Sequence, residues 1–102
     1  MIRVTVSYPR KDGARFDHEY YRNNHKQLLI DRLSPFGLQR VEIDRCLSGG
    51  QGEPPAIVAA AHMIFDGIEG FQKGMGQHGK EIMTDVGKYT DIRPGVVISE
   101  MA

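Results

Sequence analysis

The sequence predicts an α+β fold with the ferredoxin-like order β-α-β-β-α-β, formed by residues 1–102 as a single domain. Three observations support this prediction. Segments of alternating apolar and polar residues open and close the chain, two longer segments have helical spacing, and stretches rich in Gly or Pro separate the elements. In this arrangement a four-stranded antiparallel sheet carries both helices on one face.

The first strand is predicted over Ile2 to Pro9, where every second residue is apolar. Pro9 ends it, and a turn is expected at Asp12-Gly13. If the apolar residues of the strands face the helices, the opposite sheet face has a mixed composition: Arg3, Thr5, Ser7, Glu42, Asp44 and Cys46. Association of two such sheets would cover this mixed face, so a homodimer is expected.

The first helix is predicted over about residues 18–33. Asp17 can cap its first turn by accepting a hydrogen bond from a free backbone amide. Phe16, before the cap, can pack against Tyr21 as a hydrophobic staple. Pro35 ends the helix, because a proline disfavours helical geometry in the residue before it.

Two strands are predicted in the middle of the chain. The segment from residue 37 to 50 alternates Val41, Ile43 and Leu47 with polar residues and reads as a half-polar strand. A Gly/Pro connection follows, and residues 56–66 (AIVAAAHMIFD) are apolar on both faces, which predicts a central strand. The alanines make a helix the competing interpretation, but the β-branched residues and the flanking Pro and Gly favour a strand.

The second helical segment, from Gly67 to Gly87, is expected to be interrupted. Its middle reads GMGQHG, and three glycines would break or kink a helix there. A Gly-rich kink could form a mobile lid carrying His78, or leave His78 as an exposed loop residue. The last strand, from residue 91 to 101, is expected in two parts with a bend at Pro94-Gly95.

Composition excludes several classes of function. Lys plus Arg and Asp plus Glu number 13 each, so no net positive charge favours nucleic acid or an anionic membrane. The single cysteine, Cys46, cannot form an intramolecular disulfide and suits a reducing compartment. The first residues lack the regions of a signal peptide, and no apolar run is long enough to span a membrane. A cytoplasmic location is therefore expected.

The first helix carries the principal candidate residues. At about 100° per residue, His18 and His25 lie about 20° apart, and His25 falls in the middle of the packing face. Tyr21, Leu28 and Leu29 lie on the same side, and Tyr21 is an i,i+4 neighbour of His25. His25 would then point between helix and sheet as a general base or acid, with Tyr21 donating a hydrogen bond. The alternative is a core histidine bonded to a backbone carbonyl or to Tyr21.

The other residues considered have weaker signals for a functional role. His18 and His25 are about 10 Å apart along the helix and cannot share an ion, so no metal site is expected. His62 interrupts an apolar strand, and a pocket-lining role and a structural hydrogen bond both remain open. Cys46 has no basic partner nearby in the sequence that would activate it. The glycines at 74–79 are not a dinucleotide fingerprint, because no βαβ context surrounds them.

Several of these residues together resemble the EthD family, named for ethyl tert-butyl ether degradation. The resemblance extends over essentially the whole chain and is most specific at Phe16, Tyr20-Tyr21, His25, Phe65-Asp66 and Tyr89 to Pro94. It implies a dimeric α+β barrel from a superfamily of small monooxygenases, muconolactone isomerases and haem-binding or haem-degrading proteins. In many of these the ligand lies between sheet and helices, and related isomerases and dehydratases transfer protons with His or Tyr. Only His25 and Tyr21 map onto that role here.

The resulting hypothesis is a dimeric, cofactor-free enzyme of small-molecule catabolism, of isomerase, lyase or monooxygenase type. His25 and Tyr21 would be catalytic, while His62, Leu28 and Leu29 would bind a small hydrophobic substrate. One alternative is a non-catalytic protein that binds a ligand in support of an oxygenase system. Another is haem binding through His25 or His62. The sequence leaves the substrate open, and with it the question of turnover.

Overall fold

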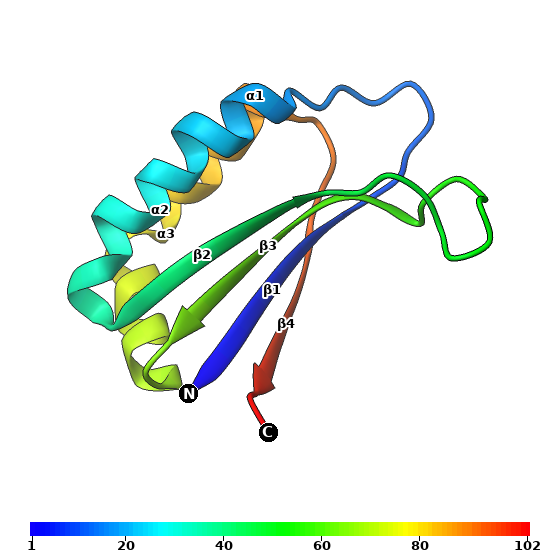
Figure 1. The fold of residues 1–102 in the computed structure, drawn as a ribbon. Coiled ribbons are helices and arrows are strands. Elements are labelled where there is room, and N and C mark those ends of the chain that lie inside the picture. Colours follow the sequence, from blue (N-terminus) through cyan, green and yellow to red (C-terminus); the bar gives the residue numbers. More distant parts are fainter.

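Four strands form one antiparallel sheet in the order β2-β3-β1-β4, and the helices cover one of its faces (Figure 1). The strands of this computed structural model, which describes residues 1–102, are β1 (Ile2–Pro9), β2 (Leu38–Arg45), β3 (Ile57–Phe65) and β4 (Gly95–Glu100). The predicted α+β class and element order are confirmed. The strand that is apolar on both faces, β3, is central, as its composition indicates.

The first helix runs without a break from His18 to Leu33, as predicted. It consists of α1 (His18–Tyr20), a π-helical turn η1 (Tyr21–His25), α2 (Lys26–Leu33) and a final 3-10 turn η2 (Ser34–Phe36). The Asp17 carboxylate accepts a hydrogen bond from the Tyr20 amide at 3.1 Å, so the predicted cap is confirmed. The predicted staple is also present, because the rings of Phe16 and Tyr21 meet edge to face with centroids 5.1 Å apart.

The second helix, α3 (Ile68–Tyr89), is continuous, and the predicted interruption at its glycines is wrong. Two glycines let α3 lie close to the end of the first helix, near Leu33 and Phe36. A Cβ on Gly70 would stand 2.0 Å from the carbonyl oxygen of Phe36, and one on Gly74 would stand 2.8 Å from Leu33. Packing along the helix therefore outweighs the weak helical propensity of glycine. His78 lies on this helix, half-buried beside the ring of Phe36, so it belongs to neither a lid nor a loop.

The hydrophobic core lies between the sheet and the helices. The apolar residues of β1 face inward as predicted, with Val4 and Tyr8 buried against the helical layer. One half of the core contains Leu29, Leu33 and Ile82, and the other is rich in aromatic rings. None of the helices is long and apolar enough to cross a membrane.

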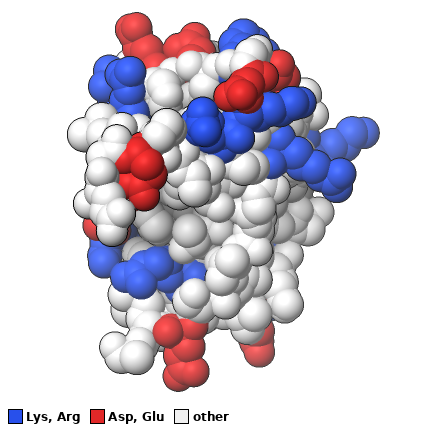
Figure 2. All heavy atoms as spheres, turned by 90° about the vertical axis from the view of Figure 1, so that its right-hand side faces the viewer, with Lys and Arg blue, Asp and Glu red and all other residues white.

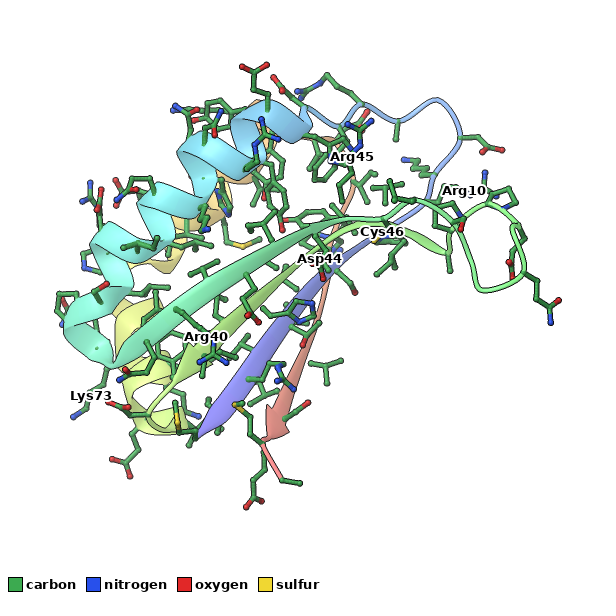
Figure 3. The ribbon with its side chains drawn as sticks, in the orientation of Figure 1. Arg10, Arg40, Asp44, Arg45, Cys46 and Lys73 are labelled. Carbon is green, nitrogen blue, oxygen red and sulfur yellow. The ribbon has the colours of Figure 1, made fainter.

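The opposite face of the sheet has no cover within the chain. Figure 3 shows Arg40 and Asp44 pointing away from the helices, whereas Arg45 points toward them. In Figure 2, which looks at the molecule from the right-hand side of Figure 1, uncharged side chains fill the centre, and charged ones lie mostly above it, below it and to its left. The edge strand β4 places the exposed Val97 on this face beside Thr5, whereas Val96 and Ile98 pair with Val6 and Val4 and lie on the helix side of the sheet.

Two strand boundaries differ from the prediction. The second strand, β2, ends at Arg45, and Leu47 is 85 % exposed beyond it instead of continuing the alternation. The final strand begins only at Gly95, so the predicted first part of it, residues 91–94, is a connection to α3. Proline at position 94 has no amide hydrogen to donate to β1, which favours a strand that starts after it.

Candidate active site

A cavity of about 260 Å³ lies between the helices and the inner face of the sheet. Its wall is mainly apolar, formed by Val4, Val6, Leu29, Ala61, Met63, Phe71, Met75, Ile82, Met83, Val86, Pro94 and Val96. Four other side chains complete the wall: Tyr8, Tyr21, His25 and Arg93. Such a small apolar cavity with a few polar groups is typical of sites for small organic molecules.

His25 is held at the cavity wall by Asp85 of α3. Its Nδ1 lies 2.8 Å from Oδ2 of Asp85, and both side chains are nearly buried, with 5 % and 9 % exposed. The other oxygen of Asp85 accepts a hydrogen bond from the Tyr20 hydroxyl at 2.8 Å and lies 3.6 Å from Nζ of Lys88. Asp85 therefore has a full set of partners and fixes the orientation of the imidazole.

The electrostatics of this pair favour a neutral imidazole and an ionised carboxylate. Burial lowers the pKa of His25, and the hydrogen bond and charge of Asp85 offset this only in part. Burial alone raises the pKa of Asp85, but hydrogen bonds from His25 and Tyr20 and the nearby positive charges bring it below its usual value. Because an ionised carboxylate only accepts, Nδ1 of His25 carries the proton and donates to it. Nε2 is then left with its lone pair, which is the form a general base requires.

The Tyr21 hydroxyl is a buried polar group without a hydrogen-bond partner in the protein. Its ring lines the cavity and stacks near His25, with centroids 5.8 Å apart. Burial raises its pKa strongly, so the group is a hydroxyl and not a phenolate. An unpaired buried hydroxyl costs about 1–3 kcal/mol, which a hydrogen-bond acceptor supplied by a ligand would offset. The neighbouring Tyr8 hydroxyl, in contrast, is paired with that of Tyr89.

The π-helical turn η1 places Tyr21 at its start and His25 at its end, and both residues are buried. A π turn is wider than an α turn and often occurs at functional sites. The aromatic cluster of Tyr8, Phe16 and Tyr89 packs against this turn. This packing holds the two candidate residues on one side of the helix.

Asp85 is the site residue that the sequence reasoning missed. It lies on the packing face of α3, three residues after Ile82 and four before Tyr89, and all three residues are buried. A carboxylate in the apolar stripe of an amphipathic helix is a signal that could have been noticed. Its partner His25, however, lies 60 residues earlier in the chain.

The structure brings together only some of the candidate residues. His25, Tyr21 and Leu29 line the cavity, whereas Leu28 faces a polar groove on the outer side of the helices. His62 lies on the uncovered sheet face, where its ring nitrogens are 3.3 Å from Thr5 Oγ1 and 3.0 Å from Asp44 Oδ2. Of the two roles left open for His62, the hydrogen-bonding one matches its position, and it is absent from the cavity wall.

The remaining titratable candidates lie outside the cavity. His18 is half-buried against Phe16 at the start of the first helix. Burial raises the pKa of the Cys46 thiol, and Asp44 adds to the effect, which disfavours the thiolate. No three His, Cys, Asp or Glu side chains lie together in a way that could hold a metal ion.

Comparison with solved structures finds chains of similar structure. The chain is similar to an EthD-like protein from Ralstonia eutropha JMP134, with 42 % identity and a TM-score of 0.91 over 97 % of this chain and 89 % of that chain. An ethyl tert-butyl ether degradation family protein from Bacillus halodurans C-125 shares 22 % identity with a TM-score of 0.68, over 100 % and 99 % of the two chains. A protein from Arabidopsis thaliana has the same fold at 12 % identity and a TM-score of 0.73, over 100 % and 96 %. No protein-family model and no curated protein matches the chain.

Proposed function

The chain belongs to the EthD family, and from this premise we propose that it is a proton-transfer enzyme of small-molecule catabolism with His25 as its base. The observation that carries the proposal is the 2.8 Å hydrogen bond to Asp85 from His25, which lines a mainly apolar cavity. A buried imidazole held by a carboxylate is a general base oriented in one direction. Positioned acid–base groups of this kind contribute about 10²–10⁴-fold to a rate.

The substrate of this mechanism is a small, mainly apolar compound with a C–H bond next to a carbonyl. Nε2 of His25 takes the proton, and the electron pair of the C–H bond moves to the carbonyl oxygen to form an enolate. The hydroxyl of Tyr21 donates a hydrogen bond to that oxygen, and the carboxylate of Asp85 stabilises the imidazolium. The imidazolium then returns the proton to the same or another carbon, or to a leaving group. These steps use side chains of the chain alone and need no cofactor.

Proton exchange tests the proposal before the natural substrate is known. A panel of small cyclic and branched ketones, including 3-oxocyclohexane-1-carboxylate and its carboxamide, is incubated with the protein in D₂O. Proton NMR follows the loss of the signals next to the carbonyl. We expect the protein to accelerate exchange for at least one ketone beyond an equal concentration of free imidazole. His25→Gln should reduce that acceleration by about 10²-fold or more.

The matched control is His78→Gln, which removes a half-buried imidazole from α3 that does not line the cavity. This variant should exchange protons at the wild-type rate. Ketones that bind to the protein without faster exchange would contradict proton transfer and support a ligand-binding function instead. Exchange that survives in His25→Gln would remove His25 from the chemistry.

We also propose that the protein is a homodimer whose subunits meet at the uncovered side of the sheet. The edge strand β4 leaves Val97 62 % exposed on this side of the sheet, and Val96 and Ile98 are 55 and 42 % exposed on the inner side of the same edge. Exposed apolar side chains on an edge strand favour association. Sedimentation at micromolar concentration should give twice the mass of one chain, and a monomeric mass would contradict the proposal.

A further inference from the structure

Arg93 is the one charged side chain in the cavity wall, because His25 is a neutral imidazole there and the tyrosines keep their hydroxyl protons. It lies in the connection between α3 and β4, directly before Pro94 and close to Val96, which also line the cavity. Arg93 is exposed to solvent, and its guanidinium takes part in none of the salt bridges of the chain. The wall contains no Asp or Glu, so nothing in it neutralises this positive charge.

Most other positive groups near the site are already paired. Arg32 binds Glu81 through two hydrogen bonds, Arg15 donates to two backbone carbonyls at the end of α3, and Lys88 lies beside Asp85. Arg93 differs from them because it combines an unpaired guanidinium with a position on the apolar cavity. A guanidinium presents a planar fork of donors that matches a carboxylate with two parallel hydrogen bonds.

We propose that the ligand of this cavity is a carboxylate whose anionic end is bound by Arg93 while its apolar body fills the cavity. The inference rests on the proposed function only where it places the reacting carbonyl of the ligand next to His25 and Tyr21. At 260 Å³ the cavity is slightly below the usual range of about 300–1,000 Å³ for ligand pockets. The substrate class is therefore a small oxo acid with an apolar ring or branched chain between its carbonyl and its carboxylate.

The expected contribution of Arg93 is moderate, because the side chain is exposed. Solvent weakens exposed ion pairs, and salt at physiological concentration screens charges beyond about 8 Å. Against this, hydrogen bonds to a charged partner are stronger than neutral ones. We expect 3-oxocyclohexane-1-carboxylate to bind about tenfold more tightly than the neutral 3-oxocyclohexane-1-carboxamide at low salt, with a smaller ratio at high salt.

The test measures the affinity of both probes by NMR titration of the isotopically labelled protein. Arg93→Met removes the charge but keeps an apolar stem against the cavity, so it separates charge from packing. In this variant the ratio of the two affinities should fall to about one, while Arg93→Lys should retain part of it. Arg10→Met is the matched control, because Arg10 is a surface residue near Asp12 outside the cavity, and it should leave the ratio unchanged.

The outcomes separate this inference from the proposed function. A carboxylate preference that depends on Arg93, without accelerated exchange, supports the anion site and contradicts proton transfer. Exchange of both probes at rates that Arg93→Met leaves unchanged supports proton transfer and overturns the anion site. The inference is also overturned if the wild type shows no preference, including the case in which neither probe binds, or if the preference survives in Arg93→Met.

Discussion

Replacing single glycines of α3 by alanine should give opposite changes in stability within one helix. Gly76 is exposed, and a Cβ there would meet no atom within 4 Å. Alanine should raise the free energy of unfolding by about 0.5–1 kcal/mol, because glycine is the weaker helix former by about that amount. At Gly70 the same Cβ would stand 2.0 Å from the carbonyl oxygen of Phe36, a backbone atom that cannot rotate away.

The magnitude at Gly70 follows from that contact. Real Cβ atoms essentially never approach closer than 3.0 Å, so α3 and the η2 turn must separate by about 1 Å. Overpacking of this kind costs about 1–3 kcal/mol, which exceeds or cancels the gain in helix propensity. Gly70→Ala should thus be less stable than Gly76→Ala by about 1–3 kcal/mol. Gly74→Ala should fall between them, because its Cβ meets the flexible side chain of Leu33 at 2.8 Å.

Urea unfolding at one fixed protein concentration measures this order. For a chain of this size the unfolding midpoints of Gly70→Ala and Gly76→Ala should differ by on the order of 1 M. The concentration is fixed because any association would add to the apparent stability. Equal midpoints for these two variants would refute the close contact between α3 and Phe36, and with it our explanation of why α3 continues through its glycines.

Four further predictions concern the site and the first helix. Tyr21→Phe removes the unpaired hydroxyl, so the free energy of unfolding in urea should stay equal or rise by about 1 kcal/mol while ketone exchange slows; a clear loss of stability would contradict the unpaired state. Asp85→Asn removes the groups that raise the pKa of His25, so NMR titration should find this pKa lower still, and an unchanged value would argue against the pair. Burial holds the pKa of His25 below 6.5, so the unfolded chain takes up a proton on this residue before the folded chain does. The free energy of unfolding should therefore fall as the pH drops below about 6.5, by at most about 1.4 kcal/mol per pH unit. The fall should be less steep in His25→Gln. Asp17→Ala removes the cap of the first helix and should lower the free energy of unfolding by about 1 kcal/mol, whereas no change would show that water replaces the carboxylate.

Local chemistry in the sequence determined the elements and much of their position. Alternation predicts β1 and its inward face, and Asp17 and Pro35 mark the ends of the first helix. Residues 57–65 are apolar on both strand faces, which predicts a central strand. These signals depend on residues only a few positions apart, so they can be recognised in the sequence alone. The same spacing places Tyr21 and His25 on one helix face, and the structure confirms that both are buried there.

Contacts between residues far apart in the chain were decided only by the tertiary structure. The helix α3 is continuous because its glycines meet Phe36 and Leu33, which no local propensity scale includes. His25 has Asp85 as its partner across 60 residues, and Arg93 reaches the same cavity from the connection to β4. His62 lies on the other side of the sheet because strand pleating assigns each residue to one face, and the pairing with Thr5 fixes which face it takes. The sequence therefore identified the imidazole, and the packing of α3 against the first helix supplied the carboxylate that orients it.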